Sequence, residues 1–172
     1  MRLSQIRLKF KMNIIDFIIK YISYLVAFIL SLLVVLIVYD ATSRYVFSTG
    51  STALQELEWH FFDVVILLSI AYALKHSAHV RVDIFYSKFS KKIKLYIDIF
   101  SSLFFIIPLS FLIIYVGVGF VELSFVQHEA SSDPGGLSYR WIVKSLMPLA
   151  FILLSLQAFK ELYTDIKRLK EI

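Results

Sequence analysis

Four long stretches with little charge constrain the fold of this chain more than any other feature. They lie at about residues 21–39, 54–74, 95–121 and 141–160. A helix of about 20 apolar residues spans a lipid bilayer, and backbone polar groups in lipid must bond to one another. Strands of a membrane barrel would be only about 10 residues long and would alternate between polar and apolar residues. These stretches are longer and show no such alternation. The sequence therefore predicts an all-α integral membrane protein with four transmembrane helices.

The composition supports this class and excludes others. Hydrophobic residues make up 59% of the 172 positions and the mean hydropathy is +0.76, whereas a soluble domain is about 45–50% apolar. A soluble enzyme and a disordered tail are therefore excluded. The chain has no cysteine, which also excludes a disulfide scaffold and thiolate chemistry. We expect one membrane domain over residues 1–172.

The basic residues predict the orientation. Of the 18 Lys and Arg residues, 15 precede the first span, follow the fourth, or lie between spans two and three. Only Arg44, Arg140 and Lys144 lie on the other side. Loops rich in Lys and Arg stay in the cytoplasm, so we expect both termini inside (N-in/C-in). The net charge of +5 then indicates contact with anionic head groups and no nucleic-acid partner.

Two features of local structure are also predicted. Between helices two and three, Asp83 is a candidate cap for a short interfacial helix through Phe89, whose apolar residues would rest on the membrane surface. Ser90 can cap the third span in the same way. Pro108 lies well inside that span and predicts a kink or close packing.

The first half of the second span is unusually polar. Glu56, Trp59, His60 and Asp63 recur at helical spacing and share one face, while Glu58 lies on another. Asp63 is about 12 Å inside the start of the span at 1.5 Å per residue. A carboxylate at that depth costs a few kcal/mol unless it is paired or protonated. This cluster is therefore the main candidate for a role beyond spanning.

Three interpretations of the cluster remain open. The acids can pair with Arg44, Arg140 and Lys144 and so set the helix register. They can contact a second membrane protein. They can also relay protons, although span two offers only two hydroxyl groups between Asp63 and its far end. Because spans one and three are more uniformly apolar, we expect those two to face lipid and spans two and four to face protein.

An enzyme is not indicated, because no nucleophile, phosphate-loop or zinc-protease motif appears. An independent carrier is not indicated either, since carriers build a midplane site from paired repeats with broken helices. Four helices, two of which are too polar to face lipid, suggest an accessory subunit that packs against a larger partner. One alternative is the membrane anchor of a redox enzyme with haem between His60 and His128, because His76 and His79 lie too close on one stretch to ligate opposite faces of the iron.

Several sequence segments occur in the order found in one transporter family. They are DATSRYVF from Asp40, LQELEWH from Leu54, HVRVD from His79 and RWIVKSLMP from Arg140. With these segments the chain closely resembles the small membrane subunit (DctQ type) of tripartite ATP-independent periplasmic (TRAP) transporters. The sequences of these segments are most similar to those of the mannitol/chloroaromatic subgroup.

The resemblance implies a function and partners. Such a subunit belongs to a sodium-driven, binding-protein-dependent importer of an organic acid in the bacterial inner membrane. It binds neither substrate nor cofactor. It scaffolds a large elevator-type subunit (DctM type), which receives substrate from a periplasmic binding protein.

The resemblance also singles out individual positions. Those matching recurring family residues are Arg44, Glu56, Glu58, Trp59, His79, Arg81, Asp83, Arg140, Trp141, Lys144 and Pro148. His79, Arg81 and Asp83 would form a structural cluster at the inner face. Trp59 and Trp141 would anchor at the membrane interface. Arg140 and Lys144 would pair internally or meet the large subunit or the arriving binding protein.

Overall fold

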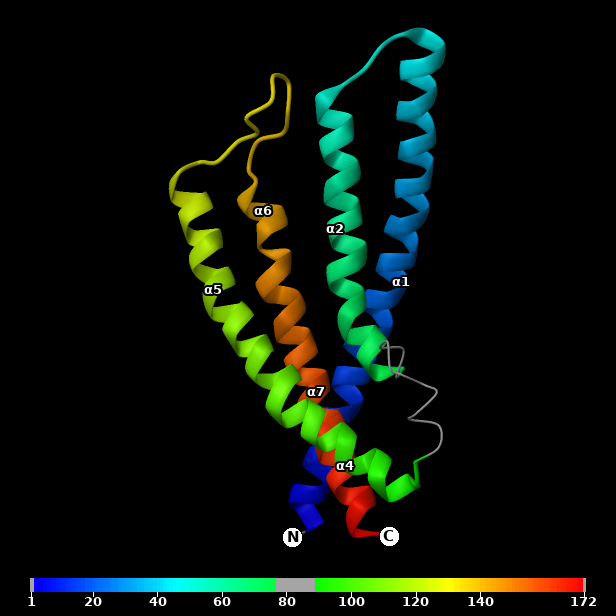
Figure 1. Cartoon of the computed structure of the whole chain (residues 1–172), viewed down its shortest axis with the longest axis vertical. Coiled ribbons are helices and arrows are strands. Elements are labelled where there is room, and N and C mark those ends of the chain that lie inside the picture. Colours follow the sequence, from blue (N-terminus) through cyan, green and yellow to red (C-terminus); the bar gives the residue numbers. More distant parts are fainter. Residues whose placement is uncertain (1, 77–88, 172) are drawn as a thin grey trace.

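The computed structural model describes residues 2–76 and 89–171, with side chains from residue 14 onward (Figure 1). This part of the chain is helical and contains no strand. Its helices are α1 (Arg2–Phe47), α2 (Thr52–Lys75), α4 (Lys91–Ser101), α5 (Ile107–Val126), α6 (Trp141–Lys144) and α7 (Leu146–Lys170), with a π-helical segment, Ser102–Ile106, between α4 and α5. Within the described ranges, four helical rods are long and apolar enough to cross a membrane, as the sequence predicted.

The rods lie side by side in the order α1, α2, α7, α5, since α1 packs on α2, α2 on α7 and α7 on α5. Both termini lie at one end of the molecule, which we call the terminal end, and the loops after α1 and α5 lie at the other, the loop end (Figure 1). Helices α2 and α7 therefore each have a protein neighbour on two sides. This agrees with the expectation that spans two and four pack against protein.

Helix α1 is much longer than its apolar stretch. It continues to Phe47 because its polar C-terminal residues bond within the helix. The Thr42 hydroxyl donates to the Val38 carbonyl at 2.7 Å, and Asp40 pairs with Arg44 one turn further on. The helix ends where Ser48 adopts a φ of +53°, a conformation that an α-helix cannot continue. Residues 40–47, which follow the span expected to end at about residue 39, are thus also helical.

The third rod has a cap and a distortion that the sequence predicts. The Ser90 hydroxyl accepts from the Ile93 N–H at 3.4 Å, which confirms it as the N-cap of α4. Pro108 has no N–H to donate to the carbonyl four residues earlier. The chain responds with a π-turn, in which the Ile107 N–H donates to the Ser102 carbonyl. The rod curves along this region (Figure 1).

The core lies towards the terminal end, where α2, α5 and α7 meet. Its buried residues are Leu74, Ile107, Leu154 and Ala158. Further towards the loop end, buried Gly117 of α5 faces Met147 and Pro148 of α7, so that the two backbones approach closely. Many large apolar side chains elsewhere are exposed, as expected for helices whose outward faces meet lipid.

Candidate functional site

At the loop end, Glu56 of α2 holds the loop between α5 and α6. Its carboxylate accepts from the Ser131 hydroxyl and from the Leu137 N–H at 2.6 Å. Arg140 lies 3.6 Å away. The Glu56 side chain is only 12% exposed. The expected pairing between the acids of span two and the outer bases is thus confirmed for Glu56 and Arg140.

The loop is folded tightly around this carboxylate. The Gly136 N–H donates to the Asp133 carbonyl at 3.0 Å. A Cβ at Gly136 would lie 2.4 Å from the Ser131 side chain and 2.9 Å from a Glu56 carboxylate oxygen, so only glycine fits there. Glu56 therefore links α2 by hydrogen bonds to a loop that lies 75 to 81 residues later in the chain.

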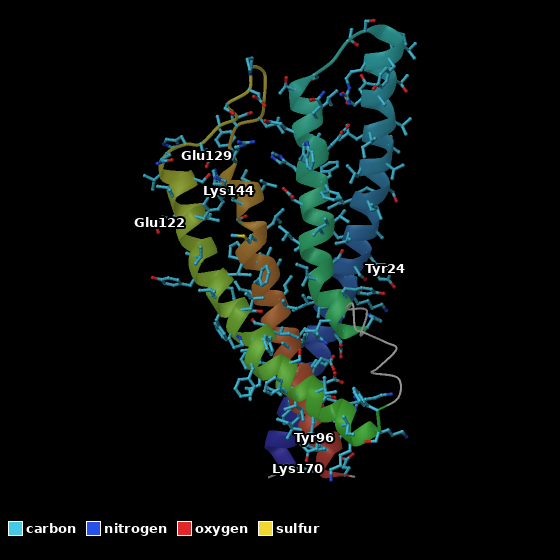
Figure 2. All side chains as sticks on the ribbon, in the orientation of Figure 1. Tyr24, Tyr96, Glu122, Glu129, Lys144 and Lys170 are labelled. Atoms are coloured by element: carbon cyan, nitrogen blue, oxygen red, sulfur yellow. The ribbon has the colours of Figure 1, made fainter. Side chains whose placement is uncertain are left out.

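Lys144 pairs with Glu129 of the same loop, which the sequence did not suggest (Figure 2). Its Nζ also lies 4.0 Å from the centroid of the Phe120 ring, a cation–π arrangement. The Glu129 carbonyl accepts from the Arg140 N–H at 3.1 Å. Arg140 and Lys144 therefore both hold this loop through contacts within the chain. The hydrogen bond from Lys144 holds the pKa of Glu129 below its usual range.

This pair predicts an acid-dependent stability. A lowered folded-state pKa contributes stability that is complete above the unfolded pKa, about 4.3 for glutamate, and is lost as pH falls through the folded value. Glu129→Gln should therefore lower the melting temperature at pH 7. Its difference from wild type should shrink as the pH falls below the unfolded pKa and vanish only below the lowered folded-state pKa. Thermal unfolding in detergent across this range tests it. Glu122→Gln, an exposed glutamate near the same end, is the control, and a pH-independent Glu129→Gln difference would contradict the prediction.

Arg44, the third base at the loop end, is engaged within its own helix. It pairs with Asp40, whose side chain is fully buried while that of Arg44 is 43% exposed. Glu58 of α2 lies close to this pair, near enough to interact electrostatically with both Asp40 and Arg44. One buried oxygen of Asp40 and one of Glu58 have no hydrogen-bond partner in the described part of the chain. Glu58 thus belongs to the contact between α1 and α2, on a different face from Glu56.

Asp63 is not paired in the way the sequence suggested. The three bases at the loop end pair with Asp40, Glu56 and Glu129, and Asp63 makes no ion pair within the described ranges. Its side chain is half-buried. The expectation that these three bases pair with the acids of span two therefore does not hold for Asp63, because Lys144 pairs with Glu129 and Arg44 with Asp40. The spacing of residues along α2 could not show that Glu129, an acid from the loop between α5 and α6, would pair with Lys144.

The two tryptophans have different surroundings. Trp59 is 66% exposed and makes an edge contact with Phe62, with ring centroids 6.3 Å apart. Trp141 is half-buried at the start of α6 and packs edge-on against Phe125 at 5.3 Å. Trp141 thus joins α6 to α5, whereas Trp59 lies on an uncovered face of α2. Pro148, the last matched position, is buried against α5.

A charge cluster at the terminal end was not predicted. Asp16 of α1 pairs with Lys75 of α2 at 3.0 Å and with Lys160 of α7. Three helices thus meet at one carboxylate. The sequence shows Asp16 as a single acid among the basic residues that precede the first span, but nothing in it indicates which residues Asp16 would pair with. His79, Arg81 and Asp83, and the interfacial helix expected to start at Asp83, lie outside the described residues.

Comparison with known proteins agrees with this architecture. The family model described as the DctQ component of tripartite ATP-independent periplasmic transporters matches residues 33–168, from the middle of α1 to near the end of α7. No curated protein matches the chain. The match does not support a redox anchor, because the family is a transporter component rather than an enzyme. With four apolar rods and a match over most of its length, this multi-pass membrane chain belongs to the DctQ family of TRAP transporter subunits.

Proposed function

We propose that this chain is the small, non-substrate-binding membrane subunit of a sodium-driven, binding-protein-dependent transporter that imports an organic acid. In this proposal it lies in the bacterial inner membrane with both termini in the cytoplasm and enlarges the static scaffold of the large DctM-type subunit. The substrate class follows the resemblance to the mannitol/chloroaromatic subgroup. Family membership supports the transporter context, and the surface of α2 supports the scaffolding role.

The observation that carries the proposal is an uncovered face on α2. Although this helix has protein neighbours on two sides, Trp59 is 66%, Phe62 45% and Ile66 46% exposed. Asp63 follows Trp59 by one helical turn and so borders this face. We call these four residues the α2 face. An unpaired carboxylate facing lipid at this depth costs a few kcal/mol, and a cation or hydrogen-bond donor on a partner protein removes that cost.

The chemistry of the α2 face suits a protein partner better than lipid. Aromatic side chains supply most of the binding energy at protein interfaces, and a charge at the edge of an apolar patch selects the partner. By contrast, Glu56, Arg140 and Lys144 are engaged within the chain. We therefore assign the large subunit to the α2 face and assign the polar residues at the loop end to holding the outer loop.

Co-expression with the large subunit tests the proposal. Omitting the small chain should abolish sodium-dependent uptake in vesicles supplied with the binding protein, and the small chain alone should transport nothing. Trp59→Ala combined with Asp63→Asn should weaken co-purification of the large subunit by at least about tenfold, the effect of losing one interface anchor of about 2 kcal/mol.

Tyr115→Ala is the matched control, because Tyr115 is 82% exposed on α5, which is separated from α2 by α7. It should leave both co-purification and uptake unchanged. Uptake that persists without the small chain would refute the scaffolding role. Undiminished co-purification of the double variant would refute the assignment of the large subunit to the α2 face but would leave the scaffolding role standing.

A further inference from the structure

An apolar groove lies between α1 and α2 in the half of the molecule nearer the terminal end. It has a volume of about 390 Å³, and its lining includes Ser23, Tyr24, Ala27, Leu30, Ser69 and Tyr72. The groove is open to the surrounding membrane, since Tyr24 is 60%, Leu30 46% and Tyr72 40% exposed. Figure 2 shows Tyr24 projecting from α1 in this half.

The serine hydroxyls in the groove are already bonded to their own helices. Ser23 donates to the Lys20 carbonyl at 2.7 Å, and Ser69 donates to the Val65 carbonyl. They therefore present little hydrogen-bonding capacity to an occupant. The small side chains of Ser23, Ala27 and Ser69 leave space between the helices, and the larger residues form the walls. Such a surface favours a flexible hydrocarbon chain over a polar solute.

A lysine lies at the end of the groove nearest the termini. Lys20 precedes Tyr24 by one turn, and its Nζ lies 5.9 Å from the centroid of that ring. On α2, the His76 ring stacks on Tyr72 at 4.1 Å. Among the residues with described side chains Lys20 makes no ion pair, and Asp16, one turn before it on α1, is held by Lys75 and Lys160. This mouth of the groove is thus net positive and has one cation available.

We propose that the groove binds an anionic phospholipid, with an acyl chain along Tyr24, Ala27 and Leu30 and the phosphate at Lys20. Basic pockets between transmembrane helices bind acidic head groups in this way, and an aromatic ring beside a lysine is typical of the membrane interface. A helix of another protein is about 10–12 Å across with its side chains and would cover the groove instead of entering it. The inference requires only a membrane location and stands apart from the transport proposal.

Native mass spectrometry of the purified full-length chain in mild detergent tests the site. Phosphatidylglycerol and phosphatidylcholine with the same acyl chains are added separately, and we expect several-fold greater retention of phosphatidylglycerol. Lys20→Gln should remove this preference. Ala27→Phe should remove retention of both lipids by filling the groove. Inorganic phosphate should not compete, because it lacks the acyl chain.

Lys170→Gln is the matched control, since Lys170 is an exposed lysine at the same end (Figure 2) on a different helix, and it should retain the preference. Circular dichroism without added lipid establishes that each variant is folded; Ala27 is exposed, so its replacement leaves the core intact. Equal retention of the two lipids by the wild type, or an unchanged preference in Lys20→Gln, would overturn the proposal. So would protection of a cysteine placed at Ala27 by the large subunit in delipidated detergent, because a partner protein would then cover the groove.

Discussion

Replacing Gly117 with leucine is expected to destabilise the helix bundle by about 1–3 kcal/mol, the usual cost of overpacking a tight contact. A Cβ at this position would lie 3.1 Å from the Met147 Cε and 3.3 Å from the Pro148 Cδ. The methionine can move, but the proline ring is fixed to the backbone of α7. Helices α5 and α7 must therefore separate, and thermal unfolding in detergent should show a clear fall in melting temperature.

Gly119→Leu provides the control on the same helix. Nothing lies within 4 Å of a Cβ at Gly119, so leucine there adds no clash. Leucine is also the better helix former by somewhat less than 1 kcal/mol, and this variant should be as stable as wild type or slightly more stable. Equal losses at the two positions would show that close approach of α5 and α7 is not the reason for glycine at 117.

Asp16→Lys should destabilise the terminal end by about 2–3 kcal/mol and separate α1 from its neighbours. It would place a third cation beside Lys75 and Lys160, which are 24% and 12% exposed. Breaking a fully buried pair costs about 3–5 kcal/mol, and the value here is lower because the Asp16 side chain is 37% exposed. Urea unfolding of the chain in detergent, followed by circular dichroism, measures the loss.

An exposed ion pair at the same end of the molecule gives the matched comparison. Lys167 and Glu171 are 4.0 Å apart and both are 64% exposed, so Glu171→Lys should cost no more than about 0.5 kcal/mol. The charge-swapped variant Asp16→Lys with Lys160→Asp should recover part of the loss. Similar effects of Asp16→Lys and Glu171→Lys would mean that the Asp16 cluster does not join the three helices.

Local features of this chain were predictable from sequence because their causes lie within one segment. Four apolar stretches specify four helices, since lipid allows no unbonded backbone. Ser90 precedes a helical pattern and caps it. Pro108 has no N–H and forces an irregular turn nearby. Glu56 was singled out as an acid at the loop end, and Arg140 was one of only three bases available to it on that side.

Pairings between distant segments were not predictable in the same way. Lys144 was one of three bases expected to pair with the acids of span two, yet it bonds to Glu129, which the sequence did not single out. Asp16 had no visible role until α1, α2 and α7 were placed together. In each case several partners satisfy the charge requirement, and only the packing of the helices decides which of them is within reach.

By itself the sequence determined that this protein is a set of membrane helices with a basic end, because hydropathy and charge act on each segment independently. It also carried the family signature from residue 33 to residue 168. The tertiary structure decided the order α1, α2, α7, α5 and with it which acids are paired, where α5 and α7 touch and which face of α2 stays open. Those outcomes depend on side-chain shape across helix contacts, and linear spacing does not encode which helices become neighbours.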